Sequence, residues 1–259
     1  MAHFKSLTIF YPMWNEEETI ERAVNAAFEV CDLLVETGEI AEYDVLIIND
    51  ASTDATPQIA DRLAAEDSRI SVIHHPVNRK LGGSLKTGFT NATGELVLYT
   101  DADLPFDMVE VAKAIRLLRL YEADIVSAYR LDRTGEGPRR FIYSYIYNHL
   151  VQAMFGLRFR DMNFAFKLMR RSMLDCVAMK SEGSFIDVEL LARAQKLGFS
   201  IVQFGVDYFP RTRGISTLSS NSVILKIMNE MWELRSELKS LEPLPQSVRQ
   251  PWAAEPKGN

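Results

Sequence analysis

Two aspartates at the end of an apolar run are the residues whose types and spacing most directly suggest chemistry. The segment Glu95–Pro105 reads ELVLYTDADLP, and Asp101 and Asp103 directly follow a run typical of a strand that is buried on both faces. In extended backbone, residues two apart point to the same side, about 6.5 Å from each other. Two carboxylates so placed could converge on one hard cation, Mg²⁺ or Mn²⁺, which could carry a diphosphate. An isolated Asp-x-Asp more often only ends a strand, so the interpretation depends on the surrounding segments.

The elements that must position these aspartates alternate along the first half of the chain. Strands are predicted over residues 6–11, 44–48, 70–74 and 95–100. Helices are predicted over about 15–35 and 56–65, with Asn15 and Thr56 as N-caps, and Pro12 is expected to end the first strand. Residues 78–88 are predicted to form a glycine-containing loop that leads into a further helix. The alternation predicts an α/β fold, with a Rossmann-like, mostly parallel sheet and helices on both faces.

Ligands bind at the carboxyl ends of the strands in such sheets, and four polar segments follow the predicted strands. They are residues 12–16, 50–54, 79–86 and 101–103. Asp50 could accept a hydrogen bond from a nucleobase or from a ribose hydroxyl. Gly83 and Lys86 could lie near a phosphate at a helix N-terminus. Each feature has a plainer explanation as a cap or a turn, but their convergence on one edge of the sheet favours a binding crevice.

The order of these motifs resembles the nucleotide-sugar domain of family-2 glycosyltransferases, and most of all the dolichyl- or polyprenyl-phosphate sugar synthases. The first motifs are P-x-x-N-E at 12–16, D-x-S-x-D at 50–54, N-x(3)-G-G-x(2)-K-x-G at 78–88 and D-A-D at 101–103. The resemblance continues through Arg139, Arg140 and Ser144, Asp161, Phe166 and Lys167, F-I-D-V-E-L at 185–190 and R-x-x-G-x-S at 211–216. It covers roughly residues 5–217, and so many ordered motifs are far more specific than any one of them.

The resemblance implies a glycosyltransferase A-type fold, a divalent cation, a nucleoside-diphosphate sugar donor of the GDP-mannose or UDP-glucose type, and inversion at the anomeric carbon. The residues implied in donor binding are Pro12, Asn15, Glu16, Asp50, Asp54, Gly83, Lys86, Asp101, Ala102 and Asp103, with Asp101 and Asp103 as metal ligands. Those implied in acceptor binding are Arg130, Arg139, Arg140, Ser144 and Lys167, and the catalytic candidates are Asp103, Asp161, Asp187 and Arg211. This chain departs from the pattern at Asn49, where Asp is usual, and at Pro105, where Gln often stands. It departs again at Ala165, where Gly is common.

The acceptor half combines an apolar helix with basic residues. Residues 140–155 would form a helix roughly 24 Å long, too short to cross a bilayer upright. Residues 130–171 carry nine Lys or Arg against three Asp or Glu, a balance of +6, whereas the whole chain carries −6. A buried helix would explain the apolar run alone, but aromatic and basic residues together are typical of a helix at a membrane interface. Under the transferase interpretation, Arg139 and Arg140 would bind a lipid phosphate.

The nature of the acceptor decides whether a general base is needed. An alkyl phosphate is mostly a dianion at neutral pH and already nucleophilic. A sugar or protein hydroxyl would instead need a base, for which Asp161 and Asp187 are the candidates. A non-catalytic nucleotide- or lipid-binding protein of the same fold is the remaining alternative. The sequence identifies neither the sugar nor the nucleobase of the donor.

The sequence divides into a catalytic domain over 1–217, with a nucleotide-sugar half to about residue 130, an amphipathic helix over 218–241 and a disordered tail over 242–259. The helix could dock on the domain, form a homodimer, or contact a membrane or a partner membrane protein. No signal peptide or membrane span is expected, and the isolated Cys31 and Cys176 favour a reducing cytosol. A cytoplasmic protein at the cytoplasmic face of a membrane is therefore expected. Overall acidity, with no recognisable nucleic-acid module, argues against nucleic acid as a partner.

Overall fold

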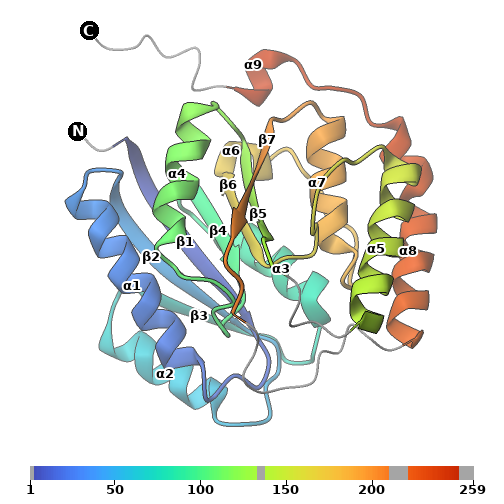
Figure 1. Ribbon diagram of the computed structural model, residues 1–259. Coiled ribbons are helices and arrows are strands. Elements are labelled where there is room, and N and C mark those ends of the chain that lie inside the picture. Colours follow the sequence, from blue (N-terminus) through green and yellow to red (C-terminus); the bar gives the residue numbers. More distant parts are fainter. Residues whose placement is uncertain (1–2, 133–137, 210–220, 251–259) are drawn as a thin grey trace, which may run out of the picture.

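The structure, a computed structural model, describes residues 3–132, 138–209 and 221–250, without the side chains of 138–146 and 221–226. Its centre is a seven-stranded sheet with the order β3-β2-β1-β4-β6-β5-β7 (Figure 1). The strands are β1 Phe4–Met13, β2 Ile40–Asn49, β3 Ile70–His74, β4 Leu96–Thr100, β5 Ile125–Arg130, β6 Phe166–Arg170 and β7 Ile201–Val206. Neighbouring strands are parallel except around β6, which is antiparallel to β4 and β5. The predicted α/β class with a mostly parallel sheet is confirmed.

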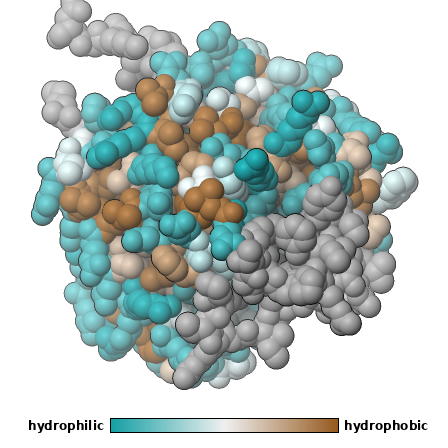
Figure 2. Space-filling view, in the orientation of Figure 1, coloured by the Kyte–Doolittle hydropathy of each residue, from teal (hydrophilic) through white to brown (hydrophobic). Residues whose placement is uncertain are grey.

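Helices cover both faces of the sheet, and each face has its own apolar core. They are α1 Ile20–Glu36, α2 Thr56–Glu66, α3 Lys80–Asn91, α4 Glu110–Leu120, α5 Pro138–Phe155, α6 Arg171–Leu174, α7 Ile186–Lys196, α8 Asn221–Ser240 and α9 Gln246–Arg249. One core joins the sheet to α1, α2 and α4, and the other joins it to α3 and α5–α8 (Figure 1). In the space-filling view, hydrophilic and hydrophobic side chains are mixed on the side where α1 and α2 lie (Figure 2), since both helices bury apolar positions but α1 also exposes Leu33 and Val35.

Four local predictions are wrong for reasons of backbone geometry. Thr56 is not the N-cap of α2 but its first residue, and Ala55 stands at the N-cap position. Pro12 does not end β1, which continues to Met13. Asn15 is not an N-cap, because its φ is +58° and α1 begins only at Ile20. The predicted glycine-containing loop over 78–88 is largely helical, since α3 begins at Lys80.

The C-terminal part packs on the domain further than expected. The helix predicted over 218–241 corresponds to α8, whose Ile227, Met231 and Leu238 are buried in the second core. Residues 242–250 were expected to be disordered, yet they include α9, and the Leu244 amide donates to the Leu197 carbonyl at 2.9 Å. The prediction for 251–259 falls outside the described residues. Of the helices described, none is both long and apolar enough to cross a bilayer.

Gly88 marks the closest approach of α3 to the sheet and gives a stability prediction. A Cβ atom at Gly88 would lie 2.2 Å from Cε2 of Phe10, which is fully buried and packs against the rings of Phe89 and Tyr99. Gly88→Ala is therefore expected to lower the unfolding free energy by about 1–3 kcal/mol through overpacking. Urea denaturation measures the loss. Thr90→Ala, at an exposed position on the same helix, is the matched control and should change stability by less than about 0.5 kcal/mol. Equal stability of both variants would contradict the packing argument.

Candidate active site

Hydrogen bonds join the segments that follow β1 and β2 at the carboxyl edge of the sheet. Pro12 lies at the end of β1 in register with Ile48 of β2. The Asn15 side chain accepts a hydrogen bond from the Thr53 amide at 2.8 Å. The Glu16 amide donates to the Thr56 hydroxyl at 2.8 Å. Asn15 has a positive φ, in the left-handed region that Asn tolerates better than most residues. This conformation allows both contacts to form. The first two polar segments of the prediction are thus brought together.

Asp54 accepts hydrogen bonds from both of these segments. Its carboxylate accepts the Thr56 amide at 3.0 Å and the Glu17 amide at 3.2 Å. Burial acts to raise the pKa of Asp54, but the hydrogen bonds from Thr56 and Glu17 outweigh it and hold that pKa below its ordinary value. The contacts of Asp54 therefore fix the segment that follows β2 against the segment that follows β1.

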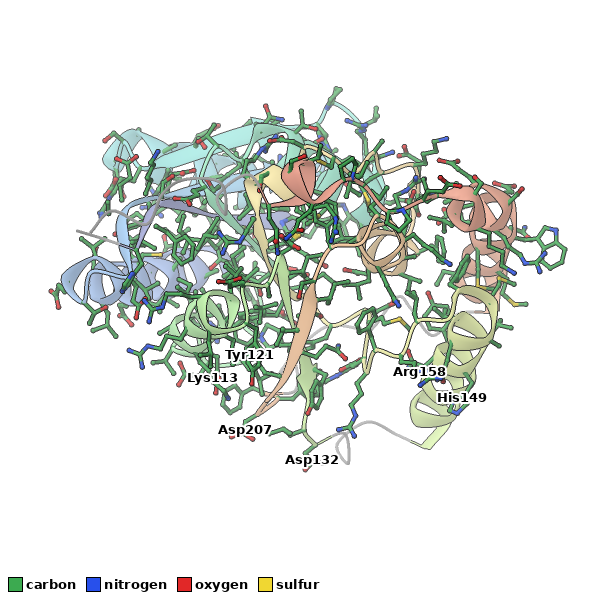
Figure 3. The ribbon with its side chains drawn as sticks, turned by 90° about the horizontal axis from the view of Figure 1, so that it is seen from above. Lys113, Tyr121, Asp132, His149, Arg158 and Asp207 are labelled. Carbon is green, nitrogen blue, oxygen red and sulfur yellow. The ribbon has the colours of Figure 1, made fainter. Side chains whose placement is uncertain are left out.

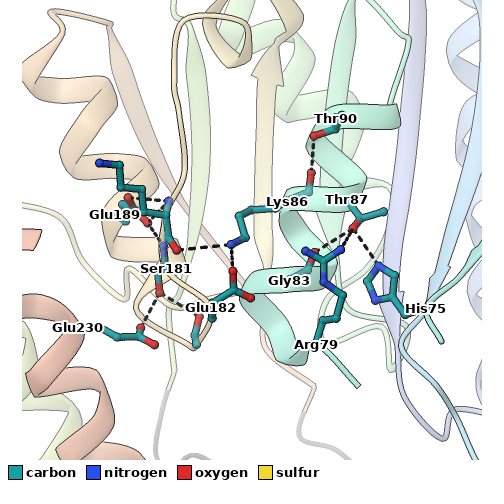
Figure 4. Close-up of polar contacts among 12 residues, drawn as sticks. His75, Arg79, Gly83, Lys86, Thr87, Thr90, Ser181, Glu182, Glu189 and Glu230 are labelled. Carbon is teal, nitrogen blue, oxygen red and sulfur yellow. Dashed lines mark hydrogen bonds and ion pairs between the residues drawn. The ribbon is translucent and has the colours of Figure 1, made fainter. Parts of the chain in front are cut away.

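Asp50 is buried at the end of β2 and connects three strands. Its amide donates to the Met13 carbonyl of β1 at 2.8 Å. Its Oδ1 lies 2.7 Å from Nδ1 of His75, which directly follows β3, and accepts the Arg79 amide at 2.7 Å. On its other side, His75 Nε2 lies 2.9 Å from the Thr87 hydroxyl of α3 (Figure 4). His75 is not among the predicted site residues, although the rule that ligands bind at the ends of strands applies to it equally.

The D-A-D segment turns immediately after β4, which corrects the expected geometry. Residues 102 and 103 form a turn, and the Leu104 amide faces the Asp101 carbonyl at 3.4 Å. Asp101 and Asp103 are therefore not related by extended backbone, as the alternation argument assumed. Ala102 is 2% exposed and packs in the first core, while Arg22 of α1 donates to the Asp103 carbonyl at 3.2 Å. Core packing of Ala102 and the contact from α1 fix the turn at the carboxyl edge of the sheet.

The residues present fit a divalent cation that is shared with a substrate. Within the described ranges, no group of three or more His, Cys, Asp or Glu side chains is arranged to hold a metal on its own. Mg²⁺ commonly takes one or two carboxylates together with substrate phosphates, rather than a closed protein cage. Asp101 and Asp103 supply two hard oxygen donors at the sheet edge where such ligands bind.

Lys86 pairs with a loop of the second half of the chain. Its amine contacts the Glu182 carboxylate and lies 3.4 Å from the Lys180 carbonyl (Figure 4). The Gly82 amide donates to the Glu182 carbonyl at 3.2 Å, and a Cβ at Gly82 would lie 2.5 Å from the Glu182 backbone. Gly83 is buried against Arg79. Here Lys86 and the two glycines hold α3 against the 180–183 loop, so their predicted phosphate contact stays a prediction.

Arg130 and Asp161 form a buried ion pair at the end of β5. Arg130 Nε lies 2.6 Å from Oδ2 of Asp161, and a second guanidinium nitrogen lies 2.6 Å from Oδ1. The two side chains are 9% and 6% exposed. The guanidinium also lies over the ring of Tyr208, 5.0 Å from its centroid. The acceptor-binding and catalytic candidates at these positions therefore neutralise each other.

Lys167 and Asp187 form a second buried pair near the first. Lys167 Nζ is 2.7 Å from Oδ1 of Asp187, and the two side chains are 0% and 2% exposed. Lys167 also donates to the Phe164 carbonyl at 2.8 Å. Burial raises the pKa of Asp187, Lys167 acts to lower it, and the nearby Asp161 acts to raise it. Neither side chain reaches the solvent, so a direct contact of Lys167 or Asp187 with a substrate is absent from this conformation.

A cavity of about 540 Å³ opens beside the Arg130–Asp161 pair. It lies between the end of β5, α5 and the segment 158–161, with His149 and Arg158 close together at one side (Figure 3). Arg160 also lines it; its backbone is held on both sides by Gln203, and its guanidinium lies 5.2 Å from the Tyr129 ring centroid. Phe159 and Leu131 add apolar surface. The basic character of this region is evident in the sequence, but His149, Arg158 and Arg160 are not among the predicted site residues.

Four predicted site residues lie where nothing can be said of their contacts. The side chains of Arg139, Arg140 and Ser144, on the first part of α5, are outside the described part of the structure, and so is the whole of Arg211. Their roles in phosphate binding and catalysis stay predictions.

Comparisons with known proteins agree on a family and a fold. The chain matches the model of Glycosyl transferase family 2 over residues 8–178. It is 33% identical over 210 residues to Glycosyltransferase AglD of Haloferax volcanii, a match that covers 79% of this chain and 33% of that protein. It is 27% identical over 213 residues to the undecaprenyl-phosphate mannosyltransferase of Micrococcus luteus, which covers 78% of this chain and 87% of that protein. The chain thus spans about a third of the first relative and most of the second.

Among solved structures, the chain is similar to glucosyl-3-phosphoglycerate synthase of Mycobacterium tuberculosis in complex with Mn²⁺ and UDP-glucose. The TM-score is 0.64 at 20% identity, over 92% of this chain and 80% of that one. At this level of identity the likeness bears on the fold. The seven-stranded sheet described above therefore has the same fold as that structure.

Proposed function

Because this chain belongs to glycosyltransferase family 2, we propose that it transfers a sugar from a nucleoside-diphosphate sugar to the phosphate of a polyprenyl or dolichyl phosphate. Residues 1–217 would form the catalytic domain. This chain matches most of the length of the Micrococcus luteus relative, and the name of that relative supports a polyprenyl phosphate as the acceptor. Membership of the family and the fold support the nucleotide-sugar donor.

In the donor half, the loops after β1, β2 and β4 would hold the nucleotide. Asp101 and Asp103 would hold Mg²⁺ or Mn²⁺, which when bound neutralises charge on the departing nucleoside diphosphate. Asp50, fixed by His75 and Arg79, would accept a hydrogen bond from the nucleoside. Arg22, which binds the Asp103 carbonyl from α1, would keep the carboxylate segment in place.

The observation that carries the choice of acceptor is the state of the two candidate bases. Asp161 is held by two guanidinium contacts of 2.6 Å, and Asp187 is 2% exposed and paired with Lys167. A hydroxyl acceptor needs a base within hydrogen-bond reach of its proton, and neither carboxylate offers one here. An alkyl phosphate is mostly a dianion at neutral pH and needs no such base. The buried pairs therefore favour a phosphate as nucleophile.

The cavity beside Arg130 suits such an acceptor in charge and polarity. Arg158, Arg160 and His149 would attract a phosphate, while Phe159 and Leu131 would contact an apolar chain. On the far side of α5, α8 exposes Met228 and Trp232, with the Arg235 guanidinium 5.4 Å from the Trp232 ring. An exposed aromatic ring beside a half-buried arginine on one helix is compatible with a membrane interface, where aromatic and basic side chains are enriched. We therefore place the protein in peripheral contact with the cytoplasmic face of a membrane.

An assay of lipid product tests the proposal. The protein is incubated with radiolabelled UDP-glucose or GDP-mannose and a short-chain polyprenyl phosphate, with Mn²⁺ or with a chelator, and organic extracts are counted. Labelled lipid is expected only with metal. The dephosphorylated polyprenol, which offers a hydroxyl in place of the phosphate, is the matched control and should accept no sugar. Transfer to the polyprenol or to added saccharides would instead establish a hydroxyl acceptor, and donor binding without transfer would favour a non-catalytic protein.

A further inference from the structure

His75 is buried between two groups of the donor half and contacts both. Its Nδ1 lies 2.7 Å from Oδ1 of Asp50, and its Nε2 lies 2.9 Å from the Thr87 hydroxyl. The side chains of His75 and Asp50 are 4% and 5% exposed. Thr87 in turn lies on α3, so the imidazole spans from the end of β2 to that helix (Figure 4).

The contact with Asp50 fixes where the imidazole carries a proton. Oδ1 of Asp50 already accepts the Arg79 amide at 2.7 Å, so this atom acts as an acceptor. At 2.7 Å, His75 Nδ1 can only be stable beside it as a donor. The Nδ1–H of His75 and the N–H of Arg79 therefore both point at the same carboxylate oxygen.

A carboxylate oxygen has about two lone-pair sites, so these two donors fill the acceptor capacity of Oδ1. For Asp50, the described part of the chain provides no hydrogen bond to Oδ2 through any side chain or backbone amide. A ligand at the end of β2 would consequently find one acceptor oxygen on Asp50 rather than two.

The nucleobases differ in what they require of a carboxylate. Guanine presents two adjacent donors, N1–H and N2–H, which pair with both oxygens of one carboxylate. Uracil presents the single donor N3–H between two carbonyl groups. A guanine paired with Asp50 would leave one buried donor without an acceptor, and such a loss is strongly selective.

We propose that His75 is a specificity-determining residue, which leaves Asp50 one free acceptor oxygen and so selects a uracil nucleotide over a guanine nucleotide. The inference rests on the proposed function, because it takes Asp50 as a contact of the donor base. It narrows the donor from the GDP and UDP types to the UDP type. If Asp50 instead bound the ribose, the base would not matter and both nucleotides would bind alike.

The test measures the binding of UDP and GDP to the full chain by isothermal titration calorimetry with Mn²⁺. The wild-type protein is expected to bind UDP at least about tenfold more tightly than GDP, the cost of roughly one unmade hydrogen bond. His75→Asn keeps a donor near the position of Nδ1 and should keep the preference. His75→Gln keeps an amide that can reach the Thr87 hydroxyl near the position of Nε2 but withdraws the donor at Asp50, so the ratio of the two affinities should fall towards one. Because the ratio is the readout, a general loss of stability does not imitate the effect.

His74→Asn is the matched control, since the neighbouring imidazole pairs with Asn49 and Asp61 and makes no contact with Asp50. It should keep the preference for UDP. Equal affinities or a GDP preference in the wild type would overturn the inference while leaving a nucleotide donor established. An unchanged ratio in folded His75→Gln, verified by circular dichroism, would overturn the role of His75. Binding of neither nucleotide by the wild type would overturn the proposed function together with this inference.

Discussion

Replacing Asp103 by Asn is expected to lower cation-dependent turnover of the donor by about 100-fold or more, the scale at which loss of one group that stabilises developing charge is felt. Asn keeps the size of the side chain but removes the negative charge that a hard cation requires. Asp103 lies in a turn that is fixed by the burial of Ala102. We therefore expect that no other carboxylate moves in to take over its role as a metal ligand. Release of nucleoside diphosphate, followed during a titration with Mn²⁺, measures the loss.

Asp107→Asn is the control for this change. Asp107 is an exposed carboxylate on the same segment, and it accepts the Val109 amide at 3.0 Å, a contact that Asn also makes. Its variant should turn over the donor at the wild-type rate with the same requirement for Mn²⁺. Unchanged turnover in Asp103→Asn would show that the carboxylate does not hold the cation, and the assignment of the metal to this segment would fall.

The convergence of the polar loops could be predicted from the sequence because one rule governs it. Parallel strands end at the same edge of a sheet, so finding the strands also finds the crevice. The strand predicted at 70–74 is confirmed at Ile70–His74. The contacts between the loops after β1 and β2, such as that from the Thr53 amide to Asn15, follow from the adjacency of these strands.

The partners of the charged residues could not be predicted in the same way. Lys167 and Asp187 meet because β6 runs antiparallel between β4 and β5. The local sequence pattern around either residue does not predict that placement. Lys86 meets Glu182 because the 180–183 loop, which lies between α6 and α7, packs on α3 on the same face of the sheet. A motif identifies such residues as unusual, but the groups that they face are set by long-range topology.

Backbone conformation explains the remaining difference at Asn15. An Asn followed three residues later by Glu is a good capping pattern, and the sequence alone favours a helix there. The structure uses Asn15 in the left-handed region instead, because its side chain accepts the Thr53 amide of the adjacent segment that follows β2. Local preference was overridden by a tertiary hydrogen bond at the functional edge, which is where such overrides are expected.

Replacing Lys167 by Met should be among the most destabilising single changes in the chain. Lys167 and Asp187 are 0% and 2% exposed, so removing the amine leaves a buried carboxylate without its cation. Loss of one partner of such a pair costs about 3–5 kcal/mol at neutral pH. The unfolding free energy, measured by urea denaturation, is expected to fall by about that amount.

The deficit should depend on pH with a definite sign. Burial already raises the pKa of Asp187 in the folded protein, and Lys167 works against that rise. Without Lys167 the folded pKa rises further, while the unfolded pKa stays near its ordinary value of about 3.9. The folded variant then holds more protons than the unfolded chain above about pH 4, so its stability declines as the pH rises. The deficit relative to the wild type should therefore shrink as the pH is lowered from about 7.5 towards 5.

Two further variants separate the loss of the ion pair from the loss of a side chain. Lys167→Met combined with Asp187→Leu removes both charges, and it should recover most of the stability and abolish the pH dependence of the deficit. Lys113→Met removes an exposed amine that is 3.3 Å from Glu110, and it should cost at most about 1 kcal/mol at any pH. A Lys167→Met variant no less stable than Lys113→Met, or a deficit that grows on acidification, would show that the Asp187 charge is compensated by other groups. The Lys167–Asp187 pair would then no longer explain why Asp187 is unavailable, and Asp187 would return as a candidate base for a hydroxyl acceptor.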